Sequence, residues 1–241
     1  MSQVTVRSVV YQIDGQSYES RLAFDASHQG PLPGLLMAPN WMGVSAGAEE
    51  IAKAVAGKGY VVLIADLYGQ QVRPSNGDEA GAAMMPLKND RGLLNKRMQA
   101  ALEQLQGQAE AAVDTSKLAT FGFCFGGCCS LELARTGAPL KAAVSFHGTL
   151  DTPNPADAKN ITGKVLALHG ADDPNVPPEE VAGFEAEMRA AKVDWQLVAF
   201  GNAVHSFTDP DANMPGRAQY NPVVAARAYA LMDSFFAEAF R

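Results

Sequence analysis

Short apolar runs alternate with helix-like segments along most of the chain, and this alternation constrains the fold more than any other feature. The apolar runs are residues 34–38, 60–65, 118–123, 142–146, 165–168 and 195–200. Runs that are apolar throughout are typical of strands covered on both faces. Helices are expected at about residues 45–57, 90–106, 127–135, 178–191 and 221–240. The pattern predicts an α/β fold whose mostly parallel central sheet carries helices on both faces.

Two segments depart from this alternation. Residues 4–13 and 17–24 are rich in β-branched and aromatic side chains, and Asp14-Gly15 between them is a hairpin turn signal. Residues 70–89 contain scattered proline and glycine instead of a periodic pattern. We therefore expect an antiparallel hairpin at the start and an irregular segment at 70–89, of a length that often forms a lid or a binding loop.

Size and charge exclude several classes of protein. The chain has 241 residues without a repeat or a linker, which is ordinary for one α/β domain, so a single domain over residues 1–241 is expected. A monomer and a homodimer are both compatible with it. Nineteen Lys and Arg against 26 Asp and Glu give a net charge of −7, which argues against a nucleic-acid partner. No apolar run approaches the length of a membrane span, and the first 15 residues lack a signal-peptide core.

The chain has three cysteines, and all of them lie within six residues, at Cys124, Cys128 and Cys129. An odd number so close together cannot form a disulfide framework, which indicates a reducing compartment such as the cytoplasm. Cys128-Cys129 lacks the two-residue spacing of zinc ligands, so no metal site is expected.

A nucleophile is predicted at Cys124. The segment GFCFGG at residues 122–127 follows a buried strand and precedes a helix, with cysteine in the position that serine takes in the G-x-S-x-G elbow. The turn is so sharp that its flanking positions must be small, and the amide groups of the following helix favour a thiolate. The alternative is that Cys124 is a small buried hydrophobe. The strand–turn–helix context favours the nucleophile, whereas Cys128 and Cys129 are expected to pack in the helix.

The base is predicted to be His205. In elbow-type hydrolases the order along the chain is nucleophile, acid, histidine, and His205 follows the strand at 195–200 through a short loop. His28 precedes the nucleophile, His147 has no strand-end carboxylate between itself and Cys124, and His169 comes before the acid loop. The alternative for His205 is a loop histidine that is merely hydrogen-bonded.

The acid is expected in the segment HGADDPNVP at residues 169–177, directly after a buried strand. Asp172 and Asp173 compete for the role. The spacing from the strand-end glycine and to the following Val-Pro favours Asp173, and Asp172 is expected to cap the loop or face solvent. The acid would hold the tautomer of the imidazole and stabilise the imidazolium.

An oxyanion hole needs two backbone N–H groups. One is predicted to be that of Phe125, directly after the nucleophile. The other should come from the loop at residues 40–43, which follows the strand at 34–38, and Trp41 is the best candidate there.

With these segments in place, the chain resembles the dienelactone hydrolase family of α/β hydrolases over essentially its whole length. The resemblance rests on the segments at residues 38–44, 59–60, 66–69, 122–127, 169–173 and 205–207. It implies the α/β-hydrolase fold, a triad of Cys124, His205 and Asp173, and a cofactor-free hydrolase whose partner is a small-molecule ester or lactone.

Two departures from the family pattern bear on the substrate. A glutamate that helps to activate the cysteine in well-known members is replaced here by Asn40, and the arginine that binds a substrate carboxylate is replaced by the stretch 208–210, where Asp209 has the opposite charge. Arg91 could supply a cation, but a solvated surface charge is the preferred reading. We therefore expect a neutral ester with hydrophobic groups. The expected pocket residues are Asn40, Trp41, Met42, Met84, Met85, Phe125 and Phe207, although Met84 and Met85 are equally well explained as core.

Two other functions fit the same residues. The triad could attack a neutral phosphotriester, which also offers an electrophilic centre and an oxygen that gains charge. Alternatively, the chain is a redox sensor or binding protein on a hydrolase scaffold, with Cys124 oxidised and Cys128 or Cys129 resolving the sulfenate. The complete order of the triad speaks against the sensor.

Overall fold

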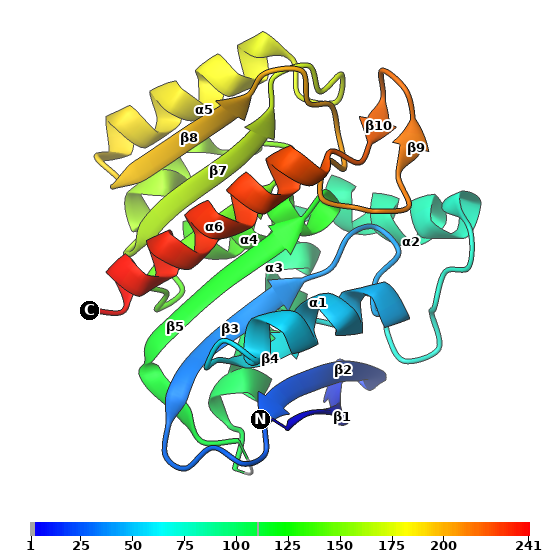
Figure 1. The fold of residues 1–241 in the computed structure, drawn as a ribbon, viewed down its shortest axis with the longest axis vertical. Coiled ribbons are helices and arrows are strands. Elements are labelled where there is room, and N and C mark those ends of the chain that lie inside the picture. The colour runs from blue at the N-terminus through cyan, green and yellow to red at the C-terminus, as the bar shows by residue number, and fades with distance from the viewer. Residues whose placement is uncertain (1–2, 110) are drawn as a thin grey trace. The chain divides into compact units, whose positions relative to one another are not determined.

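The computed structural model describes residues 3–109 and 111–241. The chain forms two compact units, Met1–Thr120 and Phe121–Arg241. The strand β5 (Val113–Phe123) runs from the first unit into the second. Strands and helices alternate along each unit after the first two strands, as the pattern of apolar runs predicts (Figure 1).

The first unit contains a twisted set of strands in the order β1-β2-β4-β3-β5. Its strands other than β5 are β1 (Val4–Ile13), β2 (Gln16–Asp25), β3 (Leu32–Ala38) and β4 (Val61–Ile64). β2 is antiparallel to both β1 and β4, whereas β3 and β4 are parallel. The predicted hairpin is confirmed. Asp14 and Gly15 have φ angles of 52° and 79°, because a two-residue turn of this type needs positive φ at both positions.

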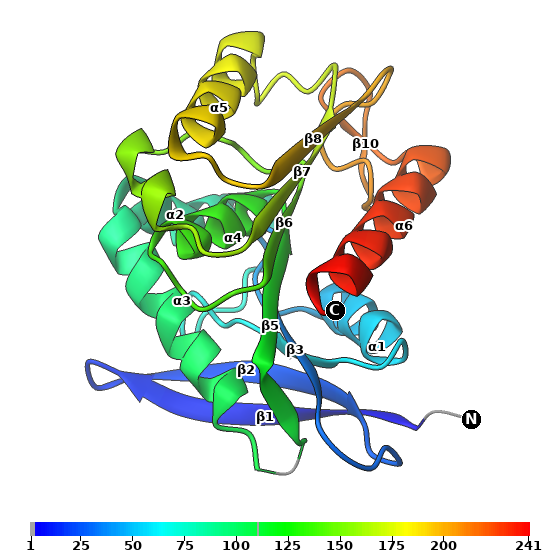
Figure 2. The same cartoon turned by 90° about the vertical axis from the view of Figure 1, so that its left-hand side faces the viewer.

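Two helices of the first unit cover opposite faces of its strands. Figure 2 shows α1 (Ala46–Ala56) on one side and α3 (Arg91–Gln106) on the other. Each begins at a side-chain cap. Ser45 Oγ accepts the Ala48 N–H at 3.2 Å, and Asp90 Oδ1 accepts the Leu93 N–H at 2.9 Å. These caps satisfy N–H groups that a helix start leaves unpaired.

The prediction of an irregular segment over residues 70–89 is wrong for most of its length, because residues 77–89 form the helix α2 (Gly77–Asn89). Its start is held by reciprocal capping. Asn76 Oδ1 accepts the Glu79 N–H at 3.0 Å, and the Glu79 carboxylate accepts the Ser75 N–H at 2.8 Å. The helix also accommodates Pro86, whose missing N–H removes one backbone hydrogen bond. Capping therefore outweighs the helix-breaking composition.

The second unit is built on parallel strands, with the end of β5 followed by β6 (Ala142–Phe146), β7 (Lys164–Gly170) and β8 (Trp195–Phe200). The helices α4 (Phe125–Arg135) and α5 (Pro178–Ala191) lie on one face, and α6 (Pro222–Ala239) lies on the other (Figure 2). The 3-10 helix η1 (Pro155–Asn160) and the small hairpin of β9 (Asn213–Met214) and β10 (Ala218–Gln219) were not predicted. None of the described helices is long and apolar enough to cross a membrane.

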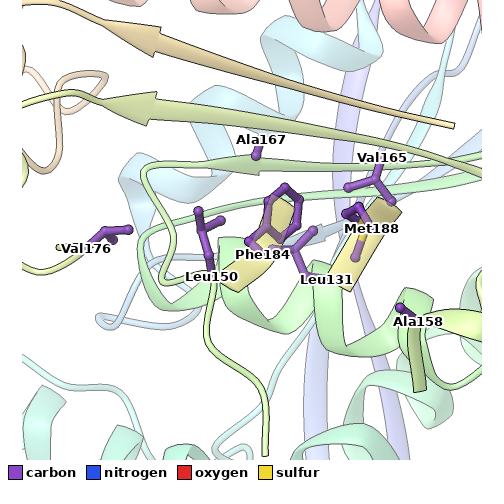
Figure 3. Close-up of a cluster of buried hydrophobic side chains, with 8 residues drawn as sticks. All are labelled: Leu131, Leu150, Ala158, Val165, Ala167, Val176, Phe184 and Met188. Carbon is purple, nitrogen blue, oxygen red and sulfur yellow. The ribbon is translucent and has the colours of Figure 1, made fainter. Parts of the chain in front are cut away.

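A buried apolar cluster fixes α4 and α5 against β7 (Figure 3). Leu131 of α4 meets Phe184 and Met188 of α5 over Val165 of β7. Leu150, Ala158, Ala167 and Val176 complete the cluster. Full burial of a large apolar side chain stabilises the fold by about 1.5–3 kcal/mol. The cluster therefore anchors both the helix that follows Cys124 and the loop that contains Asp173.

Candidate active site

Cys124 lies at a strained turn between β5 and α4. Its φ of 55° and ψ of −120° are unusual for a residue with a side chain, and such a conformation costs about 1–3 kcal/mol. The surrounding structure supports it, because the Cys124 N–H donates to the Phe146 carbonyl of β6 at 2.9 Å. The thiol is partly exposed, whereas Cys128 and Cys129 are buried in α4. The observed turn is the elbow that the GFCFGG segment predicts.

Two glycines let α4 begin directly after Cys124. A Cβ atom on Gly127 would lie 2.5 Å from Ser145 Oγ and 2.9 Å from the Gly148 Cα. A Cβ atom on Gly148 would in turn lie 2.8 Å from the Cys128 nitrogen. The first turn of the helix and the loop after β6 therefore pack backbone against backbone, and no larger residue fits at either position.

The acid loop turns Asp173 inward. The Asp173 N–H donates to the Gly170 carbonyl at 3.0 Å, and the Val176 N–H donates to the Asp173 carbonyl at 3.2 Å. The residue Asp173 is 4% exposed, and its Oδ1 accepts the Asn175 N–H at 2.8 Å. Asp172 is exposed. The turn leaves Oδ2 of Asp173 as the carboxylate oxygen that points to the histidine.

His205 lies on the loop that follows β8, and its Nδ1 is 2.7 Å from Asp173 Oδ2. The backbone holds the ring in place. The Gln219 N–H of β10 donates to the His205 carbonyl at 2.9 Å, and the next residue, Ser206, has a left-handed φ of 55°. The structure thus brings together Cys124, Asp173 and His205, the three residues that the chain order selects.

His205 favours the charged form of its ring. Burial alone lowers the pKa of His205, but hydrogen bonds from the ring to the side chains of Asp173 and Cys124, together with their charges, raise that pKa to about 10. Because Nδ1 bonds to Asp173, Nε2 is the ring nitrogen that is left for Cys124. An imidazolium between a thiolate and a carboxylate can stabilise the nucleophile and later give its proton to a leaving group.

A free amide donor lies beside the nucleophile. Phe125 is the first residue of α4, and no hydrogen bond of the described residues engages its N–H. The first amide groups of a helix have no partner within the helix, and they carry the positive end of its dipole. The Phe125 N–H is therefore available to a developing oxyanion.

In the first unit, a tight turn isolates the amide of Trp41. Asn40 Oδ1 accepts the Met42 N–H at 3.0 Å, and the Asn40 carbonyl accepts the Gly43 N–H at 2.9 Å. Tyr68 Oη donates to the Trp41 carbonyl at 2.8 Å. No hydrogen bond among the described residues uses the Trp41 N–H. Asn40 thus has a local role, since its side chain forms the turn.

Phe207 is fully buried, with its ring edge-on to His147 at a centroid distance of 4.9 Å and to Phe200 at 5.5 Å. Its place in a substrate pocket stays a prediction, as does that of Asn40 and Met42. His169 is also buried, which lowers its pKa, and its Nδ1 has no hydrogen-bond partner among the residues that the structure describes. Among the described residues, no cluster of His, Cys, Asp and Glu side chains could hold a metal ion.

The sequence interpretation missed His147 and Thr208. His147 Nδ1 accepts the Cys124 N–H at 3.2 Å, and its Nε2 lies 2.8 Å from Thr208 Oγ1. The available signal was the position of His147, which directly follows a buried strand adjacent to the elbow. A strand-end position bears on the choice of a catalytic base, but it does not by itself predict a contact with the backbone of Cys124.

Comparison with solved structures defines the class of protein. Over 99% of both chains, the structure matches that of a dienelactone hydrolase-like promiscuous phosphotriesterase from metagenomic libraries, with 40% identity and a TM-score of 0.93. The structure of a Klebsiella pneumoniae protein named "Putative Dienelactone Hydrolase" matches over 98% of this chain and 99% of its own, with 22% identity and a TM-score of 0.83, which shows the fold alone. The predicted α/β-hydrolase fold is confirmed.

Sequence comparison then places the chain within that class. The model of the dienelactone hydrolase family matches residues 20–240. A Bradyrhizobium protein named "Probable 2-oxo-3-(5-oxofuran-2-ylidene)propanoate lactonase" is 29% identical over 89% of this chain and 88% of its own length. An uncharacterized Caenorhabditis elegans protein is 36% identical over 62% of this chain and 96% of its own. The chain belongs to the dienelactone hydrolase family of ester- and lactone-cleaving hydrolases.

Proposed function

We propose that the chain hydrolyses carboxylic esters or lactones through a thioester on Cys124. The observation that carries the proposal is the 2.7 Å contact between His205 Nδ1 and Asp173 Oδ2, together with the raised pKa of His205, to which Asp173 and Cys124 both contribute. The Cys124 sulfur attacks the carbonyl carbon, and the imidazolium of His205 gives its proton to the leaving alkoxide. Water, deprotonated by His205, then cleaves the thioester and releases the acid.

Two backbone donors would stabilise the oxyanion. The unpaired N–H of Phe125 supports its assignment as one donor. For Trp41, the support is its unpaired N–H together with its position in the loop after β3. Loss of one such donor typically costs about 10²–10³-fold in rate.

Substitution of the nucleophile tests the proposal. Cys124→Ala should abolish hydrolysis of p-nitrophenyl butyrate, and mass spectrometry of the quenched wild-type enzyme should find the butyryl group on the peptide that contains Cys124. Cys129→Ala is the matched control, because it removes a buried thiol of the same helix, and it should keep its activity. Hydrolysis by Cys124→Ala above background would reject the cysteine mechanism.

We propose a neutral ester as the preferred substrate. Asp209 stands where a carboxylate-binding arginine is found in the family pattern, and its Oδ1 accepts the Asp211 N–H at 3.0 Å. Asp209→Arg should raise kcat/KM for an anionic lactone relative to p-nitrophenyl butyrate. Asp209→Asn, which keeps the turn acceptor but removes the charge, is the control. An unmodified enzyme that prefers the anionic lactone would contradict this assignment.

Phosphotriester hydrolysis is a second candidate, supported by the 40% identity to the promiscuous phosphotriesterase. Cys124 would attack phosphorus, the alkoxide would leave with the His205 proton, and water would cleave the S–P bond. The test is turnover of a p-nitrophenyl dialkyl phosphate. Release of one p-nitrophenolate per Cys124 without further turnover would reject it. Peroxide sensitivity at Cys124 without hydrolysis of any ester would instead favour the redox sensor.

A further inference from the structure

In the second unit, His147 lies between Cys124 and His205, the proposed nucleophile and base. The backbone of His147 is strained. The residue is 2% exposed, and its φ of 40° lies in the left-handed region that favours glycine. The His147 N–H donates to the Leu168 carbonyl of β7 at 2.8 Å, which fixes the residue at the end of β6. A conformation that costs about 1–3 kcal/mol persists only where its surroundings determine it.

Two hydrogen bonds define the tautomer of the His147 ring. The Cys124 N–H, which donates to the Phe146 carbonyl at 2.9 Å, is shared with His147 Nδ1 at 3.2 Å, so this nitrogen accepts and has no hydrogen of its own. The neutral ring therefore has its proton on Nε2, which donates to Thr208 Oγ1 at 2.8 Å. Through these two bonds, one rigid ring joins the elbow to the loop that contains His205.

The same ring also contacts the base directly. The rings of His147 and His205 meet at 68° with their centroids 5.2 Å apart, and Phe207 packs edge-on against His147 at 4.9 Å. Burial, and next the charge of His205, lower the pKa of His147 well below its usual value. A neutral His147 places no second positive charge beside the imidazolium of His205.

We infer that His147 is a positioning residue that sets the geometry of the Cys124–His205 pair. It holds the backbone of Cys124 through Nδ1, and it holds the His205 ring and the loop that follows it through ring packing and Nε2. The inference rests on the proposed function. His147 does not act as acid or base, because both of its nitrogens are engaged within the protein. A phenyl ring at this position would fill the same space but could form neither hydrogen bond. The two hydrogen bonds are therefore what histidine adds to the packing.

Two substitutions separate the hydrogen bonds from the packing. His147→Phe keeps a ring of similar size but removes both nitrogens. His147→Asn places an oxygen near the position of Nδ1 and tolerates positive φ better than most residues. Thr208→Val removes the other partner of the ring at nearly constant volume. Thr136→Val is the matched control, because the Thr136 hydroxyl donates to the Leu133 carbonyl at the far end of α4.

The readouts are kcat and KM for p-nitrophenyl butyrate, the NMR titration of His205, and thermal unfolding. His147→Phe should lower kcat by about 10- to 100-fold with little change in KM, as expected for a small misplacement of reacting groups. It should also lower the pKa of His205, because the hydrogen bond to Cys124 loosens. His147→Asn should recover part of both losses. Thr208→Val should lower kcat and the pKa of His205 as well, but by less than His147→Phe does. Thr136→Val should change neither quantity.

A folded His147→Phe enzyme with unchanged kcat and an unchanged His205 titration would overturn the inference. A loss in His147→Asn that equals or exceeds the loss in His147→Phe would also overturn it, since the oxygen near the position of Nδ1 would then recover nothing. If His147→Phe fails to fold, Thr208→Val decides by the same readouts. The titration of His205 needs no substrate, so it tests the positioning role even if Cys124→Ala disproves the proposed function.

Discussion

Nδ1 of His205 lies 2.7 Å from Oδ2 of Asp173, and both side chains are buried. The two residues come from loops that follow different strands, β7 and β8, and these strands are parallel neighbours. Parallel strands bring their C-terminal ends to one edge of the sheet. The distance therefore follows from the register of the strands and from the turns after them.

Asp173→Asn should lower kcat by about 10³–10⁴-fold, because an amide no longer fixes the productive tautomer of His205 or stabilises its charge. The basic limb of the profile of kcat/KM against pH should also move to lower pH, since the pKa of His205 is about 10 only with its partners in place. Asp172→Asn is the matched control, and it should retain both the rate and the profile. A basic limb that does not move in Asp173→Asn would contradict the assignment of the acid.

Stability should depend on pH through His205. Its pKa is raised from 6.5 to about 10 on folding, so its partners stabilise the folded chain fully below pH 6.5. This contribution falls as pH rises from 6.5 and is lost above about 10. In urea unfolding, the free-energy difference between the wild type and His205→Gln should shrink over this window. A constant difference across it would show that the folded and unfolded states bind the same number of protons at this site.

Local patterns predicted the hairpin at Asp14-Gly15 and the turns that bear Cys124 and Asp173. Each of these features depends on residues that are near one another in the chain. His147 could not be predicted in the same way, because its partner Thr208 is 61 residues away. Its role arises only when β6, β7 and β8 are paired. The helix α2 was missed because caps outside the helix determine its start, while its interior contains glycine and proline.

Gly127→Ala should destabilise the fold by about 1–3 kcal/mol and reduce activity, because the new Cβ would lie 2.5 Å from Ser145 Oγ and 2.9 Å from the Gly148 Cα. The strain falls at the start of α4, next to Cys124. Gly183→Ala in α5 is the matched control, since a Cβ there meets nothing within 4 Å, and it should stabilise by about 0.5–1 kcal/mol. Equal unfolding free energies for the two variants would refute the packing argument.

Tyr68→Phe should lower kcat about tenfold, which is less than the ~10²–10³-fold loss for removal of an oxyanion donor. The Tyr68 hydroxyl fixes the Trp41 carbonyl at 2.8 Å, so its loss frees the turn that presents the Trp41 N–H. Tyr18→Phe is the control within the same unit, because its hydroxyl donates to Gln16 Oε1 at 3.1 Å. If both variants keep full activity, Trp41 loses its support as a donor.

Arg135→Met should destabilise the second unit by about 3–5 kcal/mol, because it leaves buried carboxylates without their cation. The guanidinium lies 2.7 Å from Glu187 Oε1 and 2.8 Å from Glu132 Oε1, and it also donates to the Leu150 carbonyl at 3.2 Å. Its side chain is only 2% exposed, so water cannot replace the lost partners. Urea unfolding measures the loss.

Arg189→Met is the matched control for this substitution. Arg189 pairs with Glu185 on the surface of α5 with 62% of its side chain exposed, so its removal should cost no more than about 1 kcal/mol. Adding Glu187→Met to Arg135→Met should restore part of the stability, because an apolar side chain then replaces a buried charge. If the double variant is less stable than Arg135→Met alone, the cost arises from lost packing around Glu187 and not from its unpaired charge.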